Sequence, residues 1–185
     1  GIFRLLCPFF EDNLNLSKLE VEECEFGTGC ARQLTLALKG CNKSLKSISV
    51  SRNRMGEDQL AEIIEALSTH TQLEKLELVG MNAGRNECGA LTNALHSMTR
   101  LQELNLRNNT IDDDGVDALI GAIANSRLQS LNLSSNHITA RGCQSLAGLL
   151  EQPKSNLEEL HLGFNNIGDE GACIFANALS TNRKL

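Results

Sequence analysis

A single spacing of leucines recurs along nearly the whole chain. In residues 101–126, aliphatic side chains fall at positions 1, 4, 6 and 11 of the unit, and Asn109 falls at position 9. The same unit starts again every 27–29 residues, with its first leucine at Leu16, Leu45, Leu73, Leu101, Leu128 and Leu157. A period of this length is typical of stacked repeats, each of which is one supersecondary unit. The chain is therefore predicted to be built by repetition.

Each unit predicts a short strand followed by a helix. Leu104 and Leu106 alternate with polar residues, as in a strand that has one buried face. The acidic run Asp112–Asp114 then offers caps for a helix, and Val116 and Leu119 follow at helical spacing. A lone strand and a helix of about three turns bury too little apolar surface to be stable. The units must therefore stack on one another.

The pattern L-x-x-L-x-L-x-x-N/C-x-I/L followed by a helix resembles the leucine-rich repeat. The repeat length and the G-x-x-x-L type of helix start, at Gly115–Leu119, Gly142–Leu146 and Gly171–Phe175, are similar to its ribonuclease-inhibitor-like subclass. The resemblance implies an α/β fold, a right-handed solenoid with parallel strands on the concave face and helices on the convex face. It also implies that the Asn or Cys side chain at position 9 connects the turns of neighbouring repeats.

The repeats predict a single leucine-rich-repeat domain over residues 1–185. Its six full repeats start at 16, 45, 73, 101, 128 and 157, and residues 1–15 form a partial repeat with a helix over 1–13. Because the chain starts inside a helix and Leu185 opens another unit, we expect it to be a piece of a longer array. Uncapped terminal repeats would expose strand edges, so end-to-end self-association is also expected.

Two places depart from the simple pattern. In the third repeat, Met81 replaces the position-9 Asn, Ala83 the following Ile or Leu, and Glu87 the usual Gly, which predicts an irregular turn. In the fourth, the run Asp112–Asp114 lacks the spaced D-x-D-x-D-G pattern of a calcium loop. Helix capping accounts for that run, and no metal site is expected.

The composition argues against several classes of function. A net charge of −6 without any Tyr or Trp disfavours nucleic-acid binding, and no apolar run approaches the roughly 18–20 residues of a membrane span. Seven cysteines, an odd number without a C-x-x-C pair, disfavour a disulfide framework or a zinc site and favour a cytoplasmic or nuclear location. Motifs of phosphate-binding loops, serine hydrolases and zinc proteases are absent from the sequence, so neither enzyme activity nor a cofactor is expected.

The variable positions of the repeat point to another protein as the partner. Positions 3, 5, 7 and 8 alternate with the buried pair, so their side chains should project from the concave face. Their charge varies from repeat to repeat while their buried neighbours stay aliphatic. We therefore predict a partner-binding site on the concave sheet, made by Glu20, Glu22, Glu77, Asn105, Arg107, Asn132, His161 and Phe164.

Two functions from different classes fit these predictions. The first is a non-catalytic protein-interaction scaffold, such as the sensor or docking region of a protein similar to NOD-like receptors. The second is a regulator of an enzyme, similar to the GTPase-activating protein for Ran or to ribonuclease inhibitor. The sequence lacks both an acidic tail and the Trp and Tyr anchors expected of a tight inhibitor, which favours the scaffold.

Overall fold

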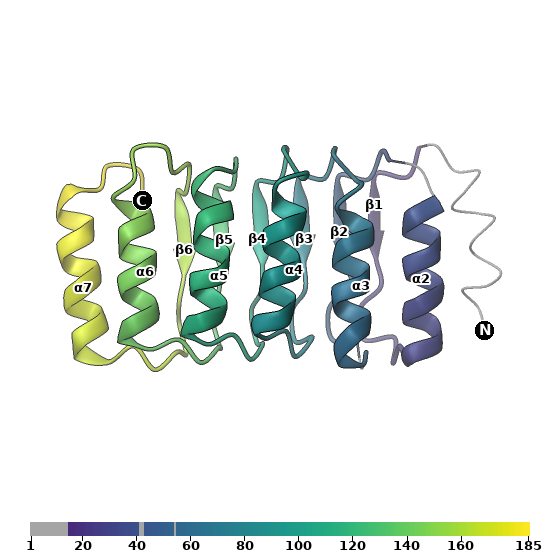
Figure 1. The fold of residues 1–185 in the computed structure, drawn as a ribbon, viewed down its shortest axis with the longest axis horizontal. Coiled ribbons are helices and arrows are strands. Elements are labelled where there is room, and N and C mark those ends of the chain that lie inside the picture. Colours follow the sequence, from purple (N-terminus) through teal and green to yellow (C-terminus); the bar gives the residue numbers. More distant parts are fainter. Residues whose placement is uncertain (1–14, 41–42, 54) are drawn as a thin grey trace.

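The computed structural model describes residues 15–40, 43–53 and 55–185, within which strands and helices alternate (Figure 1). The predicted helix over residues 1–13 lies outside this range. The elements are β1 (Lys18–Glu20), α2 (Thr28–Gly40), β2 (Ser47–Ser49), α3 (Glu57–Leu67), β3 (Lys75–Glu77), α4 (Arg85–Leu95), β4 (Glu103–Asn105), α5 (Asp113–Ala124), β5 (Ser130–Asn132), α6 (Ala140–Leu150), β6 (Glu159–His161) and α7 (Gly168–Thr181).

The six strands form one parallel sheet in the order of the sequence, β1 to β6. Equivalent positions of neighbouring repeats pair directly, so that Leu104 lies opposite Leu76 on one side and Leu131 on the other. The helices all cover the same face of the sheet (Figure 1). The predicted fold class, a right-handed α/β solenoid with strands on one face and helices on the other, is therefore confirmed.

The core lies between the sheet and the helices and is continuous along the repeats. Position 4 of the repeat, at Leu76, Leu104 and Leu131, is at most 1% exposed. The helices contribute their position-19 side chains to the same layer, and Leu91 and Leu119 are fully buried there. Each repeat thus buries its leucines against those of its neighbours, which a single unit could not do.

A buried asparagine at position 9 connects successive repeats by hydrogen bonds. Asn109 Nδ2 donates to the Leu106 carbonyl of its own repeat at 2.9 Å and to the Leu78 carbonyl of the preceding repeat at 2.8 Å. Its Oδ1 accepts from the backbone N–H groups of Met81 and Ala83, both at 2.9 Å. Asn53, Asn136 and Asn165 make the equivalent bonds to two carbonyls and at least one N–H group. The role that the family resemblance implied for position 9 is confirmed at these residues.

The turn after each strand has a left-handed residue at position 8. These residues have φ between 51° and 64° and are Glu23, Arg52, Gly80, Asn108, Ser135 and Phe164. The third repeat adds a second left-handed residue at position 10, Asn82, and the first repeat does the same at Glu25. Both repeats lack the Asn at position 9, where Met81 and Cys24 stand instead. The irregular turn predicted for the third repeat is therefore present.

A buried histidine joins the end of α2 to the following repeat. His70 is 0% exposed, and its Nε2 donates to the Leu38 carbonyl at 3.0 Å, whereas its Nδ1 has no hydrogen-bond partner among the described residues. Burial lowers the pKa of His70 below its ordinary value of 6.5. The hydrogen bond to Leu38 opposes this shift, and the positive charge of Lys43 adds to it. His70 is therefore neutral in the folded chain near pH 7.

We expect this histidine to make the chain less stable in mild acid. Because the pKa of His70 is lower in the folded chain, the unfolded chain takes up the proton first, and stability falls as the pH drops below about 6.5. His70→Gln keeps an N–H donor without a titrating ring, so its urea midpoint should change less between pH 7.5 and 5.5. His137→Gln, at an exposed position, should keep the wild-type pH dependence. Equal pH dependence of the His70 variant and wild type would contradict this assignment.

Candidate functional site

The face of the sheet that the helices leave uncovered carries the variable side chains of the repeats. We call the side chains at positions 3, 5, 7 and 8 of each repeat, together with the strands that carry them, the sheet face. All eight sequence-predicted site residues belong to it: Glu20, Glu22, Glu77, Asn105, Arg107, Asn132, His161 and Phe164. Glu77, Asn105 and Asn132 are half-buried, whereas the other five are either on the outer strands or in the turns and are exposed.

The central strands of the sheet face enclose a shallow hollow of about 90 Å³. We call it the central hollow. Four of the predicted residues meet there, namely Glu77, Asn105, Asn132 and His161. Lys75, Glu103 and Ser130 complete its polar lining. The structure thus brings half of the predicted site together, and leaves Glu20, Glu22, Arg107 and Phe164 around it on the rest of the sheet face.

A lysine between two carboxylates sets the charge of the central hollow. Lys75 Nζ lies 3.2 Å from Glu103 Oε2 and 3.5 Å from Glu77 Oε1. The hydrogen bond to Glu103 raises the pKa of Lys75 above its ordinary value, although partial burial opposes the shift. The ammonium group therefore stays charged, and the three groups together carry one net negative charge. At the other side, His161 Nε2 lies 3.8 Å from Glu159 Oε2.

Two serines of the second repeat differ from the prediction that positions 5 and 7 project freely. Ser49 and Ser51 are only 1% and 3% exposed. Ser51 Oγ accepts from the backbone N–H of Val79 at 3.0 Å and lies 2.9 Å from Ser49 Oγ, which in turn donates to the Glu22 carboxylate. Since a carboxylate only accepts, the hydroxyl protons point in sequence from Ser51 to Ser49 to Glu22. Ser49 and Ser51 are therefore buried where the neighbouring repeats form hydrogen bonds with their hydroxyl groups.

Two acidic residues of the first repeat, Glu20 and Glu23, form ion pairs with nearby basic side chains. Glu20 Oε1 lies 2.7 Å from Lys18 Nζ, and Glu23 Oε1 lies 2.6 Å from Arg52 Nη1 across the β1–β2 boundary. All four of these side chains are more than half exposed, so the pairs contribute little stability. They leave the edge of the sheet face polar and accessible.

Contacts within the described chain do not explain the positions of two exposed sheet-face side chains, Arg107 and Phe164. Arg107 is exposed, and within the described ranges its guanidinium forms no ion pair. Phe164 is 85% exposed and has φ of 60°. A bulky side chain rarely adopts the left-handed region, and doing so costs roughly 1–3 kcal/mol. An exposed aromatic ring on a strained turn is an unfavourable choice for folding alone.

Sequence reasoning missed the position-3 residues that complete the central hollow. Lys75 and Glu103 stand at the same position of neighbouring repeats and have opposite charge. That juxtaposition was a usable signal, because equivalent positions of stacked repeats lie directly opposite each other. Ser130 stands at the same position of the next repeat, and its hydroxyl donates to Glu159 Oε2 at 2.9 Å. A serine there does not by itself indicate a binding site.

Two kinds of feature are absent from the described ranges. These ranges hold no group of three or more His, Cys, Asp or Glu side chains arranged to bind a metal ion. No helix among them is long and apolar enough to cross a membrane.

Comparison with known proteins identifies what the chain is similar to. The family model described as Leucine Rich repeat matches residues 97–119, 124–147 and 154–172. A ribonuclease inhibitor of Sus scrofa is 33% identical over 122 residues, covering 65% of this chain and 26% of that protein. The human NACHT, LRR and PYD domains-containing protein 3 is 33% identical over 179 residues, covering 95% of this chain and 17% of that protein. The chain thus spans only a small part of these relatives.

Solved structures with the same fold include two that are distant in sequence. Leiomodin-1 actin-binding site 2 aligns with a TM-score of 0.62 at 17% identity, covering 80% of this chain and 86% of that one. The tropomodulin C-terminal domain of Caenorhabditis elegans aligns with a TM-score of 0.60 at 13% identity, covering 97% of this chain and 92% of that one. At these identities the likeness concerns the fold alone.

Proposed function

We propose that this chain, which carries leucine-rich repeats of the ribonuclease-inhibitor-like subclass, is a non-catalytic scaffold that binds another protein through its sheet face. The observation that carries the proposal is the contrast between the two layers of the sheet. Leu76, Leu104 and Leu131 are interchangeable aliphatic side chains beneath it. The side chains above them differ in charge, size and hydrogen-bonding capacity from one repeat to the next. Packing accounts for the first layer, and recognition would account for the second.

The chemistry of the sheet face sets what its partner must offer. The central hollow carries a net negative charge through Glu77 and Glu103 against Lys75, so it favours a cationic or hydrogen-bond-donating side chain. Arg107 offers its five N–H donors for a carboxylate of the partner. Phe164 offers an apolar ring for a pocket. A standard interface takes about 800 Å² per partner, which adjacent strands and their turns can provide as a rigid surface.

The relationship to NACHT, LRR and PYD domains-containing proteins extends the proposal. This chain covers 17% of the human member, so it corresponds to one part of such a protein. We propose that it serves as the sensor or docking region of a larger receptor of this type. The free thiols among the described cysteines, of which Cys88 and Cys143 are buried, fit a reducing compartment, and we place the protein in the cytoplasm.

The test begins by capturing the partner with the intact protein from its source cells and measuring the affinity of the purified pair by calorimetry. Arg107→Ala and Phe164→Asn should each weaken binding by about 1–2 kcal/mol, or roughly fivefold to thirtyfold. Asparagine at 164 removes the ring and still tolerates the left-handed turn. Thermal unfolding of both variants should match that of wild type or exceed it.

Gln144→Ala and Asn177→Ala are matched controls on the exposed surfaces of α6 and α7. Both should bind the partner as wild type does. Should these helix variants lose affinity while the two sheet-face variants keep it, the sheet face is not the docking surface.

A second candidate function is the regulation of an enzyme, and the similarity to the Sus scrofa ribonuclease inhibitor favours it. An enzyme that binds polyanionic RNA has reason to present a basic surface, and a chain of net charge −6 would complement it. The direct test adds the chain in excess to a pancreatic-type ribonuclease and follows RNA cleavage. A parallel assay follows GTP hydrolysis by Ran. A dose-dependent change in either rate would favour this candidate over a scaffold without effect on catalysis.

A further inference from the structure

A second hollow, of about 420 Å³, lies between α3 and α4 on the side of the chain opposite the sheet face. We call it the helix groove. Its lining comes from two parallel helices and the residues just after each of them: Asp58, Ala61, Glu62, Glu65 and Ser68 on one side, and Ala90, Asn93, Ala94 and Ser97 on the other.

The helix groove has a small-residue floor and one charged wall. Ala61, Ala90 and Ala94 supply no side-chain atom beyond Cβ, so the backbones of α3 and α4 are approachable between them. Along α3, Asp58 and Glu62 are four residues apart and Glu65 follows three residues later, so they lie on one face of the helix. The groove is therefore apolar at its base and acidic along one rim.

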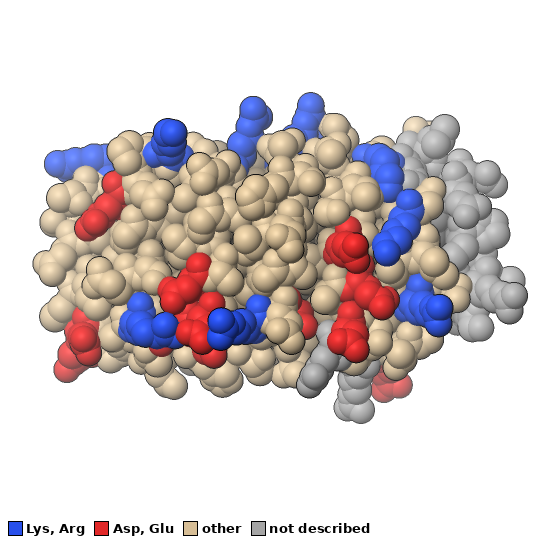
Figure 2. Space-filling view, viewed as in Figure 1, with Lys and Arg blue, Asp and Glu red and all other residues tan. Residues whose placement is uncertain are grey.

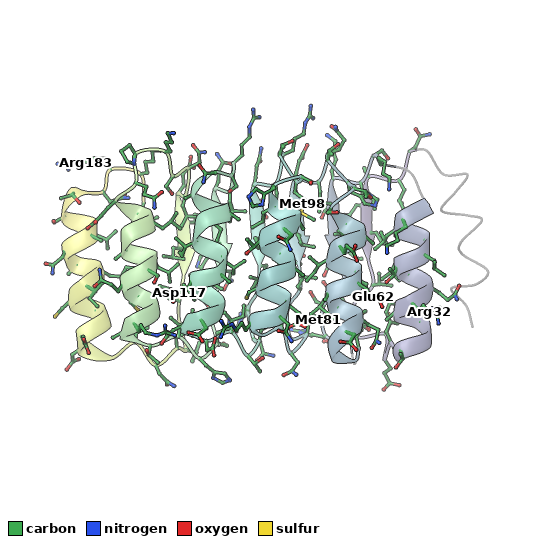
Figure 3. The ribbon with its side chains drawn as sticks, in the orientation of Figure 1. Arg32, Glu62, Met81, Met98, Asp117 and Arg183 are labelled. Carbon is green, nitrogen blue, oxygen red and sulfur yellow. The ribbon has the colours of Figure 1, made fainter. Side chains whose placement is uncertain are left out.

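Three carboxylates of α3 line the groove without an ion-pair partner among the described residues. Within the part of the chain that the structure describes, Asp58, Glu62 and Glu65 form no ion pair, and the lining of the groove contains no Lys, Arg or His. Figure 2 shows acidic side chains gathered over α3, with basic side chains beside them over α2. Glu62 and Glu65 also line a second hollow, between α2 and α3, together with Arg32 and Lys39 of α2, and they form no ion pair with either. Figure 3 labels Arg32 and Glu62 on these two neighbouring helices.

We propose that the helix groove binds a basic amphipathic helix of a partner protein. Lys or Arg side chains at a spacing of four and three residues would face the three carboxylates, and small apolar residues would rest on the alanine floor. On a helix, basic side chains at i, i+4 and i+7 have the same axial spacing as the three carboxylates, because both helices rise about 1.5 Å per residue. An extended peptide brings side chains of one face about 6.6–6.8 Å apart, which misses the last interval of roughly 4.5 Å.

The probe for this site is a fluorescently labelled alanine-rich peptide of about 18 residues with lysines at i, i+4 and i+7. Its binding to the full chain is followed by fluorescence anisotropy at low salt. The double variant Glu62→Gln, Glu65→Gln should weaken binding about tenfold or more. Ala90→Leu fills the floor without changing the charge, and it should weaken binding as well.

Three comparisons make the outcome decisive. Asp169→Asn, Glu170→Gln removes the same charge from the first turn of α7 and should leave affinity within about twofold, because these side chains are remote from the groove. A peptide with the same lysines spread around the helix should bind weakly. Equal loss in the α7 variant, equal binding of the second peptide, or unchanged affinity of Ala90→Leu would each overturn the proposal.

This site is independent of the sheet face, and one further variant separates the two. Arg107→Ala, Phe164→Asn should leave binding of the lysine peptide unchanged, since both residues lie on the opposite surface. Loss of peptide binding in that variant would place the peptide on the sheet face and contradict the helix groove as its site.

Discussion

Asn109→Ala is expected to lower the free energy of unfolding by about 3–5 kcal/mol. The side chain is 6% exposed, and its four shortest hydrogen bonds join it to backbone groups, the carbonyls of Leu78 and Leu106 and the N–H groups of Met81 and Ala83. Alanine leaves all four without their partner in a buried turn, and each such group costs roughly 1–3 kcal/mol, which partial access of water reduces. Three of the four belong to the preceding repeat, so the loss should loosen the contact between repeats.

Urea unfolding followed by circular dichroism measures this loss. The neighbouring Asn108→Gly is the matched control, because Asn108 is exposed and its φ of 57° suits glycine. That variant should stay within about 0.5 kcal/mol of wild type. A shift below about 1 kcal/mol for Asn109→Ala would mean that position 9 does not hold the repeats together.

Asp113→Ala is expected to cost about 2–4 kcal/mol, since charge-assisted hydrogen bonds contribute roughly 1.5–3 kcal/mol each before relaxation. Asp113 is 8% exposed and stands at the first turn of α5, yet its oxygens serve the next repeat. Oδ1 accepts from the backbone N–H of Thr139 at 2.8 Å and of Gly142 at 3.0 Å, and Oδ2 accepts from Thr139 Oγ1 at 2.7 Å. One carboxylate thus caps the start of α6 from the preceding repeat.

The pH dependence identifies the Asp113 contribution. Burial alone would raise the pKa of Asp113, but the hydrogen bonds from Thr139 and Gly142 and the charge of Arg141 outweigh it and lower the pKa below the ordinary value of 3.8. Its stabilisation is therefore present above about pH 3.8 and is lost as the pH falls through the lower, folded pKa. Wild type should lose more stability than Asp113→Ala over that range. Asp117→Ala, which removes exposed contacts to Arg141 and Ser145, should cost less than about 1 kcal/mol.

The sequence predicted the fold well because one physical constraint repeats. Alternation at Leu104 and Leu106 determines which face of the strand is buried, and a constant repeat length places equivalent residues side by side. The family resemblance implied that Asn109 connects neighbouring repeats, and its hydrogen bonds to the preceding repeat bear this out. Predictions about the ends of the array concern residues 1–14 and a terminal edge, and they stay predictions.

Contacts between repeats were harder to predict, because they depend on which side chain of one unit meets which backbone group of the next. The run Asp112–Asp114 was interpreted as capping its own helix, and Asp112 does so by accepting from Gly115 N–H at 3.0 Å. Asp113 instead caps the following helix, at Thr139 and Gly142. Which of the two helices Asp113 caps depends on the distance between the helices of neighbouring repeats. A sequence pattern does not give that distance.

In the candidate site too, features within one repeat were predictable from the sequence and contacts between repeats were not. Periodicity placed seven of the eight predicted residues on the sheet face, because every second residue of a strand points to the same side. Phe164 stands at position 8, in the left-handed turn after β6, and alternation along the strand does not place it. It did not predict the central hollow, which arises from the pairing of Lys75 with Glu77 and Glu103 and from the small Ser130 beside them. Nor did it predict the burial of Ser49 and Ser51, which results from their hydrogen bonds across repeats.

Site-specific photo-crosslinking tests the proposed docking surface most directly. A benzophenone amino acid replaces Arg107 or Phe164 on the sheet face, and Gln144 or Asn177 on the exposed sides of α6 and α7, each in the intact protein in its source cells. We predict that irradiation joins the chain to the same partner protein from both sheet-face positions and from neither helix position. Crosslinks to that partner from positions 144 and 177 alone would contradict binding through the sheet face.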